Sequence, residues 1–161
     1  MNIEIRQLKP EDLPYILKWA DGRGGDYTAG GLPAGPEQAK AWLASLAGRA
    51  DRRDCMVELY GTAIGLIGLT EIGAASARLY LRIGEVGYNS VRSAAYAALP
   101  MLRYAFYRLG LQTVRLAAAA GNAEAAAVFS KMGFLARGGP GAETAELTLT
   151  RADFARHEFL F

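Results

Sequence analysis

Cysteine and histidine are almost absent from this sequence of 161 residues, which holds one of each, Cys55 and His157. A single cysteine excludes an intramolecular disulfide, and its place in the apolar run 55–57 predicts a buried thiol and a reducing compartment. No cluster of His, Cys and carboxylate residues is present, so no metal site is predicted. We interpret His157 as a surface residue rather than a general base.

Long hydrophobic runs and runs of like charge are absent as well. Arg, Glu or Gly interrupts each apolar run well before the roughly 20 residues that a membrane-spanning helix needs. Residues 1–6 alternate polar and apolar side chains, unlike a signal peptide. The 18 basic and 16 acidic residues give a formal charge of only +2. We therefore expect a cytoplasmic protein with no nucleic-acid partner and no membrane partner.

What the sequence does contain is enough apolar material for one core. Hydrophobic residues make up 52% of the chain, with two Trp, eight Tyr and six Phe. This composition and length predict a single domain over residues 1–161.

Hydrophobic periodicity predicts an alternation of strands and helices. The expected strands are residues 3–8, 55–59, 62–72, 77–84, 113–118 and 145–149. The expected helices are residues 10–19, 37–46, 94–109 and 123–132. Six glycines and two prolines in residues 21–36 predict a mobile loop without regular structure. This order predicts an α/β (α+β) fold, a mixed central sheet with helices on both faces.

Several motifs resemble those of a known family. The run Gly121 to Phe134 resembles N-x-x-A-x-x-x-Y-x-K-x-G-F at all but one marked position. Ala77 to Gly84 is similar to the strand A-E-L-G-I-x-I-G, and Ile64 to Thr70 and Tyr104 to Leu111 are also typical of that family. The chain therefore resembles the GNAT (Gcn5-related) N-acetyltransferases, in particular the branch that acts on ribosomal-protein N-termini, amino sugars and antibiotics.

This resemblance implies a splayed strand pair and transfer of an acetyl group from acetyl-CoA to a primary amine, by direct attack in a ternary complex. In the family, exposed backbone of the splayed strand pairs with the pantetheine arm, and amides at a helix N-terminus bind the pyrophosphate. The cofactor-binding residues implied here are Leu81, Arg82, Ile83, Asn89, Ser90, Val91, Arg92, Ser93, Ala94, Asn122, Ala125 and Phe129.

Three residues depart from the family pattern. Arg92 stands where the phosphate loop Q/R-x-x-G-x-G/A has its central glycine, and Arg78 replaces the glutamate of the strand motif. Phe129 replaces the tyrosine that commonly protonates the leaving thiolate, and a phenyl ring cannot donate a proton. We expect Glu71 and Tyr80 to act as the acid–base residues instead. The alternatives are a solvated strand-end charge for Glu71 and a half-buried sheet aromatic for Tyr80.

Two functions are compatible with this pattern. The first is an active N-acetyltransferase whose acceptor is a small-molecule amine or a peptide N-terminus, with a homodimer as one assembly. The second is a catalytically degenerate member that acts as a binding or assembly module. Residues 22–36 and 138–143, where the family sets acceptor choice, are glycine-rich and uninformative. Binding of acetyl-CoA would separate the two.

Overall fold

The computed structural model describes residues 2–20, 25–33, 35–119, 122–136 and 146–158. They form a seven-stranded sheet in the order β1-β2-β3-β4-β5-β7-β6. Strands β4 and β5 are parallel, and the other neighbours are antiparallel. The strands are β1 (Ile3–Gln7), β2 (Arg53–Leu59), β3 (Thr62–Thr70), β4 (Ser76–Ile83), β5 (Thr113–Ala117), β6 (Leu135–Ala136) and β7 (Glu146–Thr150).

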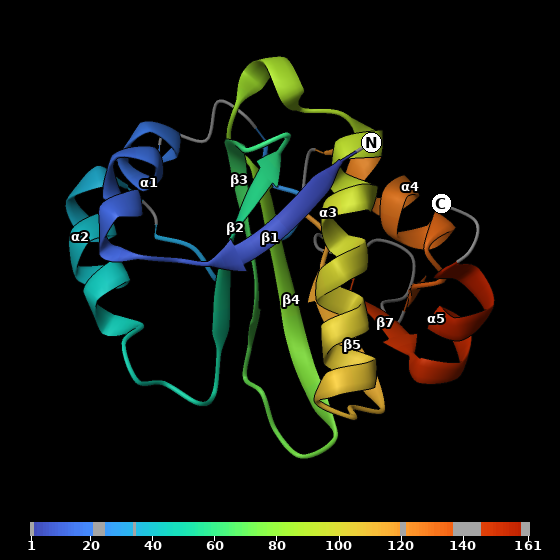
Figure 1. The fold of residues 1–161 in the computed structure, drawn as a ribbon. Coiled ribbons are helices and arrows are strands. Elements are labelled where there is room, and N and C mark those ends of the chain that lie inside the picture. The colour runs from blue at the N-terminus through green and yellow to red at the C-terminus, as the bar shows by residue number, and fades with distance from the viewer. Residues whose placement is uncertain (1, 21–24, 34, 120–121, 137–145, 159–161) are drawn as a thin grey trace.

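Helices cover both faces of the sheet (Figure 1). The helices of one face pack against a large apolar core that includes Phe106 and Phe129, and the pair on the other face packs against a smaller core around Trp19 and Tyr80. The first group is α3 (Val91–Arg103), with its continuation Tyr104–Arg108, and α4 (Ala123–Lys131); the pair is α1 (Leu13–Trp19) and α2 (Pro36–Ser45). Both faces of the middle strands are thus buried, and the predicted mixed sheet is confirmed.

Local sequence explains where the two C-terminal helices begin. Ser90 caps α3 by accepting a hydrogen bond from Ser93 N at 3.0 Å, and Asn122 caps α4 by accepting from Glu124 N and Ala125 N, both at 3.2 Å. Such side chains satisfy donors that the first helical turn leaves unpaired. Gly133, at φ +105°, follows the end of α4 in the left-handed conformation that glycine tolerates.

The structure corrects several predicted bounds. Helix α3 begins at Val91 rather than residue 94, and its last part, Tyr104–Arg108, is a π-helix. Among the elements that were not predicted are the short strand β6 and the helix α5 (Arg151–His157), which follows the capping residue Thr150. Residues 21–24 and 34 of the predicted loop and residues 138–143 lie outside the described residues.

Candidate functional site

Strands β4 and β5 form a fork. They pair only from Ser76 to Arg78 on β4 and from Thr113 to Arg115 on β5, and beyond these residues they separate. On its other edge, β4 stays paired with β3 from Arg78 to Ile83. The splayed strand pair that the sequence resemblance implied is therefore present.

The segment Gly25–Ala29 lies in the gap of this fork and bonds to both strands. On the β4 side, Tyr27 N donates to Leu81 O and Ile83 N donates to Gly25 O, each at 3.0 Å. On the β5 side, Ala29 N donates to Ala117 O at 2.8 Å and Ala119 N donates to Tyr27 O at 3.1 Å. The bridges pair Asp26 with Arg82 and Thr28 with Ala118. The segment thus spans the gap as an irregular inserted strand.

Side chains strengthen this insertion. Arg82 makes a two-pronged ion pair with Asp26, at 2.5 and 3.0 Å, and Thr28 Oγ1 accepts from Leu81 N at 2.9 Å. The Tyr27 hydroxyl donates to Asn89 Oδ1 at 2.6 Å, and the Tyr27 side chain is buried in the large core. Asn122 Nδ2 donates to the carbonyl of Asp26 at 3.0 Å.

Two sequence expectations change here. The described part of residues 21–35 contains no helix or strand, as predicted, but Gly25–Ala29 is held in place because it pairs with two strands. The backbone of Leu81 and Ile83, expected to be exposed for a cofactor, is hydrogen-bonded to Gly25–Ala29. The physical reason is that a fork between parallel strands leaves unpaired backbone groups, and burial requires that they find partners.

The loop before α3 carries the residues expected to hold phosphate. Asn89, Ser90, Val91 and Arg92 are exposed, and Ser93 and Ala94 are buried. The first N–H groups of an α-helix have no partner within the helix, and they point along its axis with the positive end of the dipole. The backbone N–H of Ser93 donates to the Ser90 side chain. The backbone N–H groups of Val91 and Arg92 therefore remain for an acceptor outside the helix.

Arg92 and Phe129 lie in contrasting environments. The Arg92 guanidinium lies 5.7 Å from the centre of the Tyr96 ring, on the exposed side of α3. Phe129 and its neighbour on α4, Ala125, are fully buried, and the Phe129 ring meets Phe134 edge-on at 5.5 Å. Phe129 therefore has the packing role of a core aromatic.

The two predicted acid–base residues lie apart. Tyr80 is buried, and its ring crosses Gly68 of β3 so that the hydroxyl donates to Asp54 on β2 at 2.5 Å. Burial, and then the neighbouring Asp54 carboxylate, raises the pKa of Tyr80 well above its usual value. Arg52 holds the same carboxylate through two hydrogen bonds at 2.8 and 2.9 Å. The hydroxyl thus points along the sheet toward β2, away from the gap.

Glu71 instead belongs to a group of four charged residues at the fork. Glu71 follows β3, and its carboxylate lies 3.5 Å from Arg115 of β5. Beside them, Arg78 donates to Glu146 of β7 at 2.8 Å. We call Glu71, Arg78, Arg115 and Glu146 the fork charges. The sequence reasoning missed Glu146, although the alternation of Glu146–Thr150, with Leu147 and Leu149 in the core, indicates that this carboxylate faces outward.

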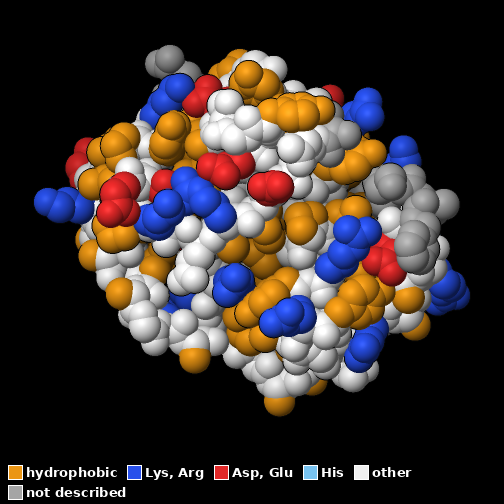
Figure 2. Space-filling model, viewed as in Figure 1, with side chains coloured by type: hydrophobic (Ala, Val, Ile, Leu, Met, Phe, Trp, Pro, Cys, Tyr) orange, Lys and Arg blue, Asp and Glu red, His pale blue; other side chains and the backbone are white. Residues whose placement is uncertain are grey.

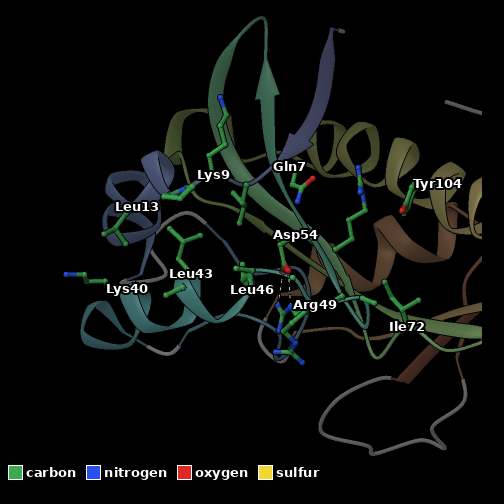
Figure 3. A pocket seen from close by; sticks show the side chains of 18 of the residues that line it. Gln7, Lys9, Leu13, Lys40, Leu43, Leu46, Arg49, Asp54, Ile72 and Tyr104 are labelled. Carbon is green, nitrogen blue, oxygen red and sulfur yellow. Dashed lines mark hydrogen bonds and ion pairs between the residues drawn. The ribbon is translucent and has the colours of Figure 1, made fainter.

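A separate cavity of about 710 Å³ lies under the ends of β1 and β3, beside α1 and α2. Figure 3 shows Leu13 and Leu43 on one side of it, Ile72 and Tyr104 on the other, and Asp54 between them. None of the residues predicted for catalysis or cofactor binding lines it, although Tyr80 reaches it indirectly through Asp54. The face in Figure 2 mixes basic and acidic side chains with exposed hydrophobic ones.

Comparison with known proteins places this geometry in a family. Residues 2–135 match the model of the acetyltransferase (GNAT) domain. The chain belongs to this family. The family, the fold and the enzyme class, an N-acetyltransferase, are therefore confirmed as predicted.

Solved structures of similar fold include forms of the spermidine N-acetyltransferase of Vibrio cholerae. One point mutant is 19% identical, with 94% of this chain and 95% of that chain covered and a TM-score of 0.77. Another is 20% identical, with 95% and 96% covered and a TM-score of 0.78. A dodecameric form in an intermediate state is 20% identical, with 94% and 95% covered and a TM-score of 0.76. No protein of curated function matches the sequence.

In this GNAT chain, the departures from the family pattern occupy defined places. Arg78, which replaces the glutamate of the family's strand motif, forms an ion pair with Glu146. A carboxylate is therefore present at the fork, supplied by β7 instead of β4. Within the described ranges, no group of three or more His, Cys, Asp and Glu residues could hold a metal ion. The same ranges contain no helix of the length and apolarity needed to span a bilayer. Cys55 is buried, as expected, and burial raises the pKa of its thiol to about 11.

Proposed function

We propose that residues 1–161 form a single GNAT domain. We propose further that this domain transfers an acetyl group from acetyl-CoA to a primary amine by direct attack in a ternary complex. The observation that carries the proposal is the fork between β4 and β5, opening beside the exposed N-terminus of α3. The edges of the fork carry backbone groups that an extended arm could pair with in place of Gly25–Ala29, and the helix offers amides for phosphate. Acetyl-CoA would supply the activated thioester.

The phosphate end of the proposed site rests on α3. The N–H groups of Val91 and Arg92 and the positive helix terminus favour an anion, and the Arg92 side chain adds a charge next to them. The missing glycine of the family loop does not remove these donors, because they belong to the backbone. Ser90 and Ser93, which bond to each other at 3.1 Å, keep the first turn in shape.

A carboxylate at the fork is proposed to take the proton of the attacking amine, directly or through water. Glu71 and Glu146 both offer one, and their side chains are 62% and 46% exposed, so solvent can relay the proton. Tyr80 stays a proposed acid–base residue that would have to act from its place beside Asp54. Arg78 and Arg115 hold the two carboxylates in place.

The acceptor is proposed to be a small amine or a peptide N-terminus. Spermidine is one candidate among small amines, because solved structures of the same fold are spermidine N-acetyltransferases. Self-association, at least to a homodimer, is proposed in line with the dodecameric form of one such protein. We also expect the enzyme to act in the cytoplasm, where Cys55 would stay reduced.

The decisive experiment measures acetyl-CoA binding by calorimetry and by the melting temperature. We expect binding to the wild type, and about tenfold or more weaker binding to Val91→Pro, which removes one phosphate-facing N–H. Proline is tolerated at this first helical position, and Ser90 before it is already extended at φ −151° and ψ 158°. The matched control, Val91→Ala, keeps the N–H and should bind like the wild type. Absence of heat and of any melting shift at millimolar acetyl-CoA would overturn the enzyme proposal in favour of a degenerate binding module.

A further inference from the structure

The gap expected to receive the cofactor is filled by the chain itself. We propose that Gly25–Ala29 is an internal occupant of the cofactor site, which has to leave the gap before the pantetheine arm of coenzyme A can enter. This inference rests on the proposed use of acetyl-CoA. It adds that Gly25–Ala29 and the pantetheine arm compete for the same backbone groups of β4 and β5.

The first argument is the identity of the bonded atoms. Beyond the fork, Leu81 O and Ile83 N on β4 and Ala117 O and Ala119 N on β5 face the gap, and the segment bonds to all four. An added strand binds a sheet through such edge groups. A second extended chain cannot use them while Gly25–Ala29 is in place.

The second argument is that the side chains expected to hold the cofactor hold the segment. Asn122 donates to the Asp26 carbonyl, Arg82 pairs with the Asp26 carboxylate, and Asn89 accepts from the Tyr27 hydroxyl. All three were predicted as cofactor residues from the sequence. The pantetheine arm contains two amide groups, and an extended peptide is its nearest chemical equivalent. The segment thus occupies hydrogen-bonding groups that such an arm could use.

The third argument concerns how firmly the segment is held. It makes one bridge to each strand, and the Asp26 side chain is 39% exposed, so its ion pair is partly screened by solvent. Tyr27, at 1% exposure, is the main anchor. A segment held in this way can exchange with a ligand. The apparent dissociation constant of acetyl-CoA then equals its intrinsic dissociation constant divided by the fraction of molecules in which the segment has left the gap.

An engineered disulfide that can be formed and reduced tests the inference. Thr28 and Ala118 face each other as an antiparallel pair whose flanking residues carry the hydrogen bonds, which puts their Cα atoms about 4.5 Å apart, within the range that a disulfide bridges. In Thr28→Cys/Ala118→Cys, oxidation should join the segment to β5. The native Cys55 is buried and does not compete. Mass spectrometry counts the free thiols, with and without acetyl-CoA.

We expect the oxidised variant to lose acetyl-CoA binding by at least about tenfold, and reduction to restore it. Saturating acetyl-CoA, added first, should prevent the disulfide. Undiminished binding by the oxidised protein, or oxidation that is no slower with acetyl-CoA, would overturn the inference. Failure of the pair to oxidise in the absence of acetyl-CoA would overturn it too, because the segment would not be where the structure places it. If the reduced variant and the wild type both fail to bind, the proposed function has failed instead.

A milder variant gives an independent reading. Tyr27→Phe removes only the hydroxyl bond to Asn89 and keeps the buried ring. Loosening the segment by one hydrogen bond should increase the open fraction and tighten acetyl-CoA binding by about two- to tenfold. Tyr60→Phe, at a 72% exposed tyrosine in the β2–β3 turn, is the matched control and should leave binding unchanged. Equal or weaker binding by Tyr27→Phe would contradict the competition.

Discussion

The two edges of β4 are paired in different ways. Toward β3, six successive residue pairs join the strands without interruption, from Gly65 opposite Ile83 to Thr70 opposite Arg78. Toward β5, only three pairs form before the strands separate, and Gly25–Ala29 takes the rest of the edge. One strand therefore combines a continuous ladder with an edge that changes partner along its length.

The difference teaches which edge can serve a ligand. The β3 edge is held by close backbone contact, since a Cβ on Gly65 of β3 would lie 2.2 Å from the carbonyl oxygen of Arg82 on β4, and by the Tyr80 ring that crosses Gly68. The other edge is held by a short segment from a distant part of the chain. Exchange of a partner needs local opening, and local opening is easier where few contacts must break.

The largest expected effect is in native-state hydrogen exchange. The amides of Tyr27, Ala29 and Ala119, which bond across the gap, should open at a free energy at least about 2.7 kcal/mol below that of the amides joining β3 to β4, roughly 100-fold faster exchange. Exchange followed residue by residue by nuclear magnetic resonance measures both sets in one sample. Equal protection of the two edges would mean that the segment is as fixed as a regular strand.

A glycine substitution should damage only the fixed edge. Gly68→Ala forces a methyl group against the Tyr80 ring and the Arg53 backbone, where no flexible side-chain end can give way. We expect a loss of about 2 kcal/mol in the free energy of unfolding, measured by urea titration. Gly87→Ala is the control, because a Cβ there meets nothing within 4 Å. A Gly68→Ala protein as stable as the control would show that β3 can shift away from the Arg53 backbone and the Tyr80 ring without penalty.

The sequence was sufficient for the elements that depend on local signals. Asn122 and Gly133 mark the beginning and the end of α4 where the motif predicted them. The alternation of apolar residues located β5 and β7 within a residue or two. The fork followed from the family resemblance. Each of these features depends on neighbours in the chain or on a motif that carries its own spacing.

The candidate site was less predictable because its contacts are distant in sequence. Asp26 pairs with Arg82, 56 residues away, and Glu146 pairs with Arg78, 68 residues away. The glycines around Gly25–Ala29 correctly indicate weak local preference, but a segment without preference takes its conformation from the groups that it meets. Nothing in residues 21–36 alone reveals that β4 and β5 leave a gap of this kind.

The smallest expected effect concerns Tyr80, on the fixed edge. Tyr80→Phe removes one hydrogen bond to Asp54, whose carboxylate keeps Arg52, so near neutral pH we expect a loss of about 1 kcal/mol in the free energy of unfolding. Because burial raises the pKa of Tyr80 in the folded state, the unfolded chain releases this proton first as pH rises above about 10. The stability of the wild type should then fall by up to about 1.4 kcal/mol per pH unit more than that of the variant.

Urea titrations of both proteins from pH 8 to above pH 10 measure this convergence. Parallel stability curves across that range would show that the Tyr80 hydroxyl is not shielded from water. The same variant tests the predicted acid–base role, because loss of a catalytic proton donor lowers kcat by about 100-fold or more, whereas loss of a structural hydrogen bond leaves kcat nearly unchanged. A large fall in kcat for Tyr80→Phe, with Glu146→Gln close to the wild type, would place the proton transfer on the β3 side of β4 rather than at the fork.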